Sequence, residues 1–105
     1  MEFFVYILYS PKADKYYVGQ TSDVTRRLKE HNNPEVFSKF SAKGIPWTLK
    51  AFFKISDSRS EANRVERFIK KQKSRIFIEK LISHRDDAEF IQQIIRKAIT
   101  VIRKS

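Results

Sequence analysis

Five polar side chains, spread over the first two thirds of the chain, have the types needed to cut a phosphodiester bond. Phenol and imidazole groups can move protons, and a guanidinium can hold two phosphate oxygens at once. A single carboxylate can hold Mg²⁺ when water and substrate phosphate oxygens fill the remaining positions. The five residues are Tyr6, Tyr17, Arg27, His31 and Glu66.

Each of these residues also has an ordinary structural explanation. Arg27 and His31 are four residues apart, so on a helix they project from the same side as a solvated arginine and a half-buried histidine. Glu66 precedes Lys70 by four residues, which is the spacing of a helical ion pair. Tyrosine is common in strands. From spacing alone we favour these structural roles, and only the combination of residues points to chemistry.

The charge of the chain predicts a polyanionic partner. Its 105 residues include 22 Lys and Arg but only 12 Asp and Glu, which gives a net charge of +10. Nucleic acid is a common partner of such proteins, because binding to phosphates releases condensed counterions. The alternative is a basic surface with no dedicated ligand. We expect seven cationic residues and one glycine, which would allow close approach at a strand end, to contact nucleic acid: Gly19, Arg26, Lys29, Lys39, Lys43, Lys70, Lys73 and Arg75.

Several classes of protein are disfavoured. The sequence has no cysteine, which excludes disulfide frameworks, thiolate metal sites and cysteine nucleophiles. Apolar runs are too short to cross a bilayer, so we expect a cytoplasmic protein without a membrane partner. The acidic residues are scattered, which argues against a two-metal nuclease, and no glycine-rich phosphate loop is present.

Three segments are predicted to be β-strands. Residues 3–9 are rich in β-branched and aromatic side chains, which is typical of a strand buried on both faces. A short turn separates them from a second strand at 16–19, so the two form an antiparallel hairpin. Residues 47–55 form the third strand. Its alternation predicts that four apolar residues share one face: Leu49, Ala51, Phe53 and Ile55.

Helices are predicted between and after the strands. The first begins near Asp23, with Thr21 or Ser22 as its cap. Residues 58–61 form a capping box that opens the second helix. The polar run at 70–75 predicts a break before a further helical segment.

A last amphipathic helix is predicted from Arg85 to about residue 104. The expected fold class is therefore α/β, of the α+β type, with a three-stranded antiparallel sheet flanked by helices. We expect one domain at 1–83. The helix at 84–105 would pack on that domain or form the interface of a weak homodimer.

The order of these motifs resembles the GIY-YIG nuclease domain over roughly residues 3–83. The run YVGQTSDVTRRLKEH at 17–31 is the most specific part. The first motif, at 4–6, keeps only its tyrosine, and the second reads Tyr-Val-Gly. The G-x-P-W element at 44–47 and the K-S-R element at 73–75 are similar to those of small, single-domain, uncharacterised bacterial members.

The resemblance implies a role for each candidate residue. Glu66 would hold one divalent ion, Mg²⁺ or Mn²⁺, and Arg27 would steady the scissile phosphate. Tyr6 would activate or orient water, with His31 and Tyr17 completing the proton path, and any of the three could be the general base. The implied activity is a metal-dependent, structure-specific DNA endonuclease of the bacterial cytosol and nucleoid, acting on branched or nicked DNA in repair or recombination. A nucleic-acid-binding module with little catalysis is the alternative, and RNA remains an open substrate.

Overall fold

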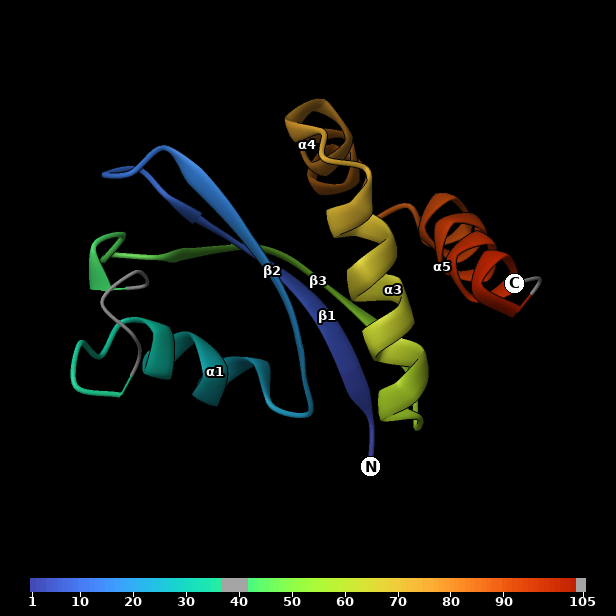
Figure 1. Ribbon diagram of the computed structural model, residues 1–105, viewed down its shortest axis with the longest axis horizontal. Helices are drawn as coiled ribbons and strands as arrows, with labels where there is room; N and C mark the ends of the chain where they lie inside the picture. Colours follow the sequence, from blue (N-terminus) through green and yellow to red (C-terminus); the bar gives the residue numbers. More distant parts are fainter. Residues whose placement is uncertain (37–41, 104–105) are drawn as a thin grey trace.

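The computed structural model describes residues 1–36 and 42–103 as three strands and four helices (Figure 1). The predicted contact of Lys39 with nucleic acid lies outside the described residues. The elements in chain order are β1 (Phe3–Ser10), β2 (Lys15–Thr21), α1 (Val24–His31), β3 (Thr48–Ser56), α3 (Arg59–Lys71), α4 (Arg75–Ser83) and α5 (Ala88–Arg103).

The strands form one antiparallel sheet in the order β2-β1-β3, so the first strand lies at the centre. The predicted hairpin is confirmed, because β1 pairs with β2 from Phe4 opposite Thr21 to Ser10 opposite Lys15. The prediction that β1 is buried on both faces is also confirmed, since Val5, Tyr6, Ile7 and Leu8 are all at most 1% exposed.

Helices cover both faces of the sheet (Figure 1). On one face, Tyr6, Leu8 and Trp47 form a cluster against which Val24 and Leu28 of α1 pack. On the other face, the larger core joins the sheet to α3, α4 and α5. The buried core members of that face are Val5, Ile7, Val18, Ala51, Phe53, Val65, Ile69, Leu81, Ile91, Ile95 and Ala98.

The predicted face of the third strand is wrong at one residue. Ile7 lies opposite Ala51, but Leu8 lies opposite Leu49, so the register shifts by one residue between these pairs. Because a one-residue shift moves side chains to the opposite face, Leu49 packs with the α1-side cluster. Ala51, Phe53 and Ile55 belong to the other core, as predicted.

The predicted cap of the first helix is also wrong. Asp23 itself is the N-cap of α1, and its carboxylate accepts a hydrogen bond of 3.0 Å from the backbone N–H of Arg26. Thr21 acts one step earlier, because its hydroxyl oxygen accepts from the N–H of Asp23 at 3.1 Å. Ser22 is not the cap. An aspartate at this position also places negative charge at the positive end of the helix.

The second cap is confirmed in half of its expected geometry. The Ser58 hydroxyl accepts from the N–H of Glu61 at 3.2 Å, as a capping box requires. The carboxylate of Glu61, however, accepts from the hydroxyl of Ser56 at 2.6 Å, and the same hydroxyl accepts from the N–H of Ser58 at 3.1 Å. Ser56 thus takes the place that the box gives to the glutamate.

The predicted break after the second helix is confirmed. It lies between α3 and α4, where Lys73 has a φ of 48° and Ser74 caps the next helix. The last helix begins at Ala88, not at Arg85, because the Asp87 carboxylate accepts from the N–H of Phe90 at 3.1 Å in the manner of an N-cap. Within the described residues, no helix has the length and apolar character needed to cross a membrane.

Candidate active site

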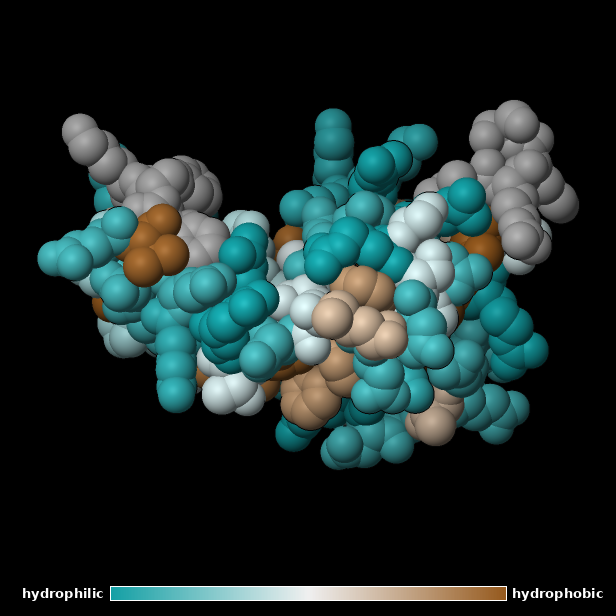
Figure 2. Space-filling view, turned by 90° about the horizontal axis from the view of Figure 1, so that it is seen from below, coloured by the Kyte–Doolittle hydropathy of each residue, from teal (hydrophilic) through white to brown (hydrophobic). Residues whose placement is uncertain are grey.

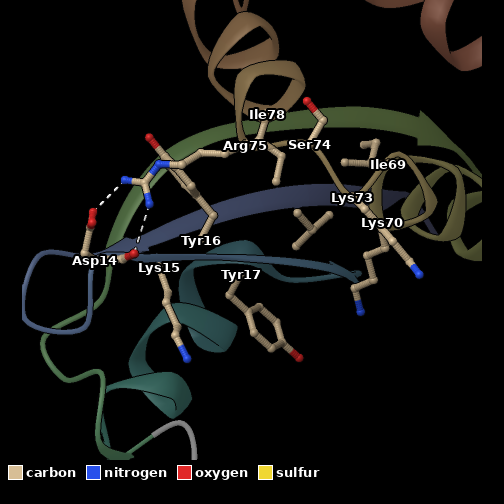
Figure 3. A pocket seen from close by; sticks show the side chains of 11 residues that line it. Asp14, Lys15, Tyr16, Tyr17, Ile69, Lys70, Lys73, Ser74, Arg75 and Ile78 are labelled. Atoms are coloured by element: carbon tan, nitrogen blue, oxygen red, sulfur yellow. Dashed lines mark hydrogen bonds and ion pairs between the residues drawn. The ribbon is translucent and has the colours of Figure 1, made fainter.

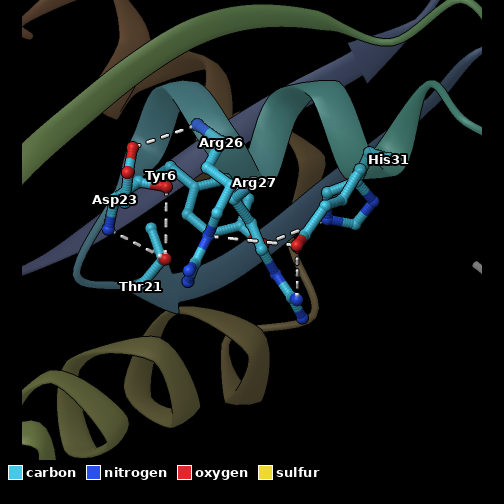
Figure 4. Close-up of polar contacts among 7 residues, drawn as sticks. Tyr6, Thr21, Asp23, Arg26, Arg27 and His31 are labelled. Atoms are coloured by element: carbon cyan, nitrogen blue, oxygen red, sulfur yellow. Dashed lines mark hydrogen bonds and ion pairs between the residues drawn. The ribbon is translucent and has the colours of Figure 1, made fainter. Parts of the chain in front are cut away.

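Tyr6 is the centre of the polar cluster that the sheet and α1 form together (Figure 4). Its side chain is 1% exposed, and its hydroxyl lies 3.1 Å from Nε2 of His31. Nε of Arg27 donates to the same hydroxyl at 3.4 Å. Since Arg27 and His31 are four residues apart on α1, one helix face delivers both groups to the end of the central-strand tyrosine.

Gly19 makes room for this tyrosine. It lies directly opposite Tyr6 in the β1–β2 pair, and a Cβ atom at Gly19 would come within 2.4 Å of the Tyr6 hydroxyl oxygen. The space that we expected to admit the substrate backbone is therefore filled by the phenol itself. The predicted contact of Gly19 with nucleic acid stays a prediction, and its observed role is to accommodate Tyr6.

We expect Gly19→Ala to lower the free energy of unfolding by about 1–3 kcal/mol, because the new methyl group must displace the buried end of Tyr6. Urea unfolding followed by circular dichroism measures the loss. Gln20→Ala, on the neighbouring half-exposed position, is the matched control and should cost less. In a Tyr6→Leu background, where the ring is absent, the Gly19→Ala penalty should largely vanish. An equal penalty in both backgrounds would contradict the steric explanation.

Tyr17 completes the aromatic part of the cluster. Tyr17 is on β2, opposite Leu8 of β1. Because Leu8 and Tyr6 alternate onto the same face of the sheet, the Tyr17 side chain lies on that face too. Its ring centroid is 4.5 Å from that of His31 and 6.2 Å from that of Tyr6. Unlike Tyr6 it is partly exposed. Tyr17 therefore lies between the buried pair and solvent.

Asn32 fixes the end of α1 against the start of β3. Its side-chain amide donates to the backbone carbonyl of Trp47 at 3.0 Å, and its side-chain oxygen accepts from the Trp47 N–H at 2.6 Å. The Trp47 ring lies beside both His31 and Tyr17, with centroid distances of 6.3 and 6.2 Å. Our sequence reasoning gave Asn32 only the role of a helix stop. Its position directly after His31 was the available signal.

Burial keeps the two central groups neutral at pH 7. It raises the pKa of Tyr6 to about 12, although the hydrogen bond from Arg27 opposes the shift and the charge of Glu66 adds to it. Burial, assisted by the nearby positive charge of Arg27, lowers the pKa of His31 to about 4. His31 is fully buried, not half-buried as its spacing suggested. A neutral imidazole with its proton on Nδ1 can accept the Tyr6 hydrogen at Nε2.

Arg27 links the buried cluster to the surface. Its Nη1 atom donates to the Glu30 carboxylate at 3.1 Å, while its Nε contacts Tyr6. The side chain is 35% exposed, so part of the planar guanidinium is accessible to a phosphate. These two contacts orient the guanidinium before any ligand arrives.

Glu66 reaches this region from the opposite side of the sheet. Its side chain on α3 is 21% exposed and forms the predicted ion pair with Lys70, with Nζ 2.9 Å from Oε2. The Lys70 ammonium lies 5.7 Å from the centroid of the Tyr17 ring. Burial contributes most to the raised pKa of Tyr6, and the negative charge of Glu66 adds a smaller contribution. The structural alternative is therefore present, and the catalytic role of Glu66 stays a prediction.

Glu66 is the carboxylate to which we assign the metal ion, and Glu30 lies beside Arg27 in the same region. Across residues 1–36 and 42–103, no group of three or more His, Cys, Asp or Glu side chains could hold a metal ion. The chemistry of a single partly exposed carboxylate still fits Mg²⁺, which keeps several waters and uses substrate phosphate oxygens as further ligands. The Lys70 ammonium would then have to release Glu66.

Several of the predicted cationic residues line a groove next to this cluster. The groove has a volume of about 480 Å³ and lies between β2 and the junction of α3 with α4 (Figure 3). Tyr17, Lys70, Lys73 and Arg75 are among its lining residues, and Lys15 is an addition that we did not expect.

Other predicted contacts lie elsewhere. Arg26 and Lys29 are exposed on α1, where Arg26 pairs with Glu30 at 3.9 Å. Lys43 is exposed beside a separate pocket of about 250 Å³ near Trp47. The face of the molecule seen in Figure 2 is mostly hydrophilic, with apolar atoms gathered near its middle. Contacts of all these residues with nucleic acid stay predictions.

Comparison with known proteins identifies the family of the chain. Residues 2–81 match a family described as the GIY-YIG catalytic domain. No curated protein matches the chain significantly. A solved structure that is similar is the NMR solution structure of the UPF0213 protein BH0048 from Bacillus halodurans, at 36% identity. The match covers 79% of this chain and 84% of that one, with a TM-score of 0.46. Since the family match spans most of the sequence, the chain belongs to the GIY-YIG family, whose members are generally endonucleases.

Proposed function

We propose that the protein is a metal-dependent endonuclease that hydrolyses phosphodiester bonds of DNA. The observation that carries this proposal is the contact of the Tyr6 hydroxyl with both His31 and Arg27, at 3.1 and 3.4 Å. A phosphate bound to the exposed part of Arg27 would place its phosphorus close to a phenol that can pass a proton inward.

The proton path follows from the pKa values. At pH 7 the Tyr6 phenol is protonated, because its pKa is about 12, so it cannot act as a phenolate. It can accept a proton from the attacking water only by giving its own proton to Nε2 of His31, which is neutral because its pKa is about 4. The hydroxide then bonds to phosphorus, the bond to the 3′ oxygen breaks, and a solvent water would protonate that oxygen as it leaves. Arg27 binds the developing negative charge.

Glu66 would hold the divalent ion, Mg²⁺ or Mn²⁺. When bound, such an ion polarises the phosphate and stabilises the leaving 3′ oxygen. The carboxylate pairs with Lys70 in the structure, which keeps a partly buried charge compensated. Both partners are on the same helix, so the pair can open by rotation of the lysine side chain without movement of the backbone.

The substrate is proposed to be branched, flapped or nicked DNA, met in repair or recombination. The cationic residues would contact phosphates, which positions a duplex without reading its bases. Among the described residues we find no helix arranged as a base-reading element. If about six phosphates are engaged, the log–log salt slope of binding should be near −5.

The test is cleavage of supercoiled plasmid and of branched DNA by the wild-type protein. We expect Mg²⁺ or Mn²⁺ to support cutting, excess EDTA to stop it, and branched DNA to be cut faster than a fully paired duplex of equal length. Added Mg²⁺ in excess over EDTA should restore activity. Equal cutting with and without the ion would contradict the proposal, because it would exclude a role for the carboxylate site.

A nucleic-acid-binding module with little catalysis is the second candidate. Two observations favour it: Lys70 occupies the carboxylate of Glu66, and the first motif at 4–6 has lost its glycine and isoleucine. This reading predicts salt-dependent binding of DNA without cutting under any metal condition. The same binding and cleavage assays therefore separate the two candidates.

A further inference from the structure

The groove beside the active-site cluster is larger than the proposed hydrolysis of one phosphodiester bond requires. It lies between β2 and the α3–α4 junction and has a volume of about 480 Å³, within the range of sites for small ligands. Tyr17 and Lys70 line the groove and also belong to the cluster around Tyr6 and Glu66. The two sites are therefore continuous through these side chains.

The lining of the groove combines an apolar floor with a cationic rim. Val18 and Ile69 are buried and Ile78 is half-buried, and all three line the groove. In Figure 3, the side chains of Tyr17, Lys70 and Lys73 extend toward the same side of the strand. A flat apolar ring joined to a phosphate matches such a lining, because the ring can contact the floor while the phosphate meets the ammonium groups.

The charge is concentrated at the end of the groove that is next to the cluster. At the far end, Arg75 pairs with Asp14 at 2.5 Å and lies 3.5 Å from Glu79. Its guanidinium is thus largely compensated by two carboxylates. At the near end, Lys70 is paired with Glu66 at 2.9 Å, and Lys73 supplies the charge at the opening that Tyr17 also faces (Figure 3). A negative group is therefore attracted to the end where the scissile phosphate would lie.

Lys73 is held at this rim by an unusual backbone conformation. Its φ of 48° is in the left-handed region, which costs a residue with a side chain roughly 1 kcal/mol relative to glycine. Glycine or asparagine is the common residue where a helix ends in this way. A lysine at this position brings a charge to the groove at an energetic cost, which is typical of functional sites.

We propose that the groove binds an unpaired nucleotide of the substrate, next to the scissile phosphate. The inference rests on the proposed function for the position of that phosphate, and it names the substrate class as DNA with a single-stranded branch. In a duplex the bases are stacked and paired, so their faces cannot reach an apolar floor. An unpaired nucleotide can rotate its base onto the half-buried Ile78 of the groove while its phosphate contacts Lys73.

The test measures binding in excess EDTA, where no cutting occurs, so it does not depend on activity. Fluorescence anisotropy compares a duplex carrying a short oligothymidine flap with a fully paired duplex of equal charge. We expect the wild-type protein to bind the flap about tenfold more tightly. A third probe has the same flap with abasic sugars in place of thymines, and the preference should be lost with it. A preference that survives without bases would overturn the proposal.

A pair of charge-matched variants assigns the preference to the groove. Lys73→Asn removes the rim charge and tolerates the left-handed backbone, so it should fold normally. It should weaken flap binding several-fold more than duplex binding. Lys71→Asn removes an equal charge from the last residue of α3, which does not line the groove, and should weaken both probes equally. Equal effects of the two variants on the two probes would overturn the proposal.

The outcomes also separate this inference from the proposed function. Flap preference without cleavage in Mg²⁺ would support the groove as a nucleotide site and contradict the nuclease. Cleavage without flap preference would support the nuclease and overturn the groove proposal.

Discussion

Replacing Glu66 by glutamine should reduce Mg²⁺-dependent cleavage by roughly 10³-fold or more, because several kcal/mol of transition-state stabilisation depend on the bound ion. The substitution keeps the size of the side chain and removes only its charge. Across the part of the chain that the structure describes, no group of three or more His, Cys, Asp or Glu side chains could hold the ion instead. Loss of the pair with Lys70, which is 50% exposed, should cost a few tenths of a kcal/mol at most.

Folding and DNA binding should therefore be retained in the Glu66→Gln variant. Removing a negative charge from a basic protein should leave affinity unchanged or slightly raise it. Glu89→Gln, an equal charge change on an exposed residue of α5, is the control and should cut at the wild-type rate. Similar cutting by both variants would contradict the prediction. It would mean that the metal binds at another site or that a contaminating nuclease cuts the DNA.

Replacing Arg27 by alanine should lower the rate of the chemical step by roughly 10³-fold, the range measured for arginines that stabilise phosphoryl transfer. Arg27 is held by Tyr6 and Glu30 in one orientation, so its loss removes both a phosphate ligand and the hydrogen bond to the phenol. Arg27→Lys should recover only a small part, since an ammonium cannot make the forked contact. Single-turnover cleavage at saturating protein measures the step.

Arg26 provides a matched control one residue away. It is on the same helix, pairs with the same Glu30, and is 64% exposed. Arg26→Ala should weaken binding of all DNA substrates alike and reduce the salt slope by about one, while leaving the single-turnover rate unchanged. If Arg26→Ala and Arg27→Ala had equal effects on that rate, the guanidinium of Arg27 would be only one more surface charge.

Much of the fold follows from local sequence patterns. The three strands, the hairpin and the break after residue 71 depend on alternation, turn length and polar runs, which act over short distances. The wrong assignments arose where distant residues decide. The side of the sheet on which Leu49 packs depends on a register shift against β1, which no pattern within β3 reveals. Thr21 and Asp23 both accept backbone hydrogen bonds at this turn, so residue type alone did not reveal which of them is the cap.

The candidate site was only partly accessible to the same reasoning. Helical spacing predicted that Arg27 and His31 share a side of α1 and that Glu66 pairs with Lys70. Spacing could not predict the full burial of His31. It also could not show that the Tyr6 hydroxyl occupies the space next to Gly19, because that contact depends on the β1–β2 register. Tertiary packing sets both features.

The paired hydrogen bonds between Asn32 and Trp47 have a consequence for variation within the family. They fasten the two ends of the connection at 33–46, so the distance between the end of α1 and the beginning of β3 is set by the clamp itself. Lengthening a connection whose ends are already joined costs little free energy. This stretch can therefore gain or lose residues, and with them new surface properties, while the histidine and tryptophan keep their places.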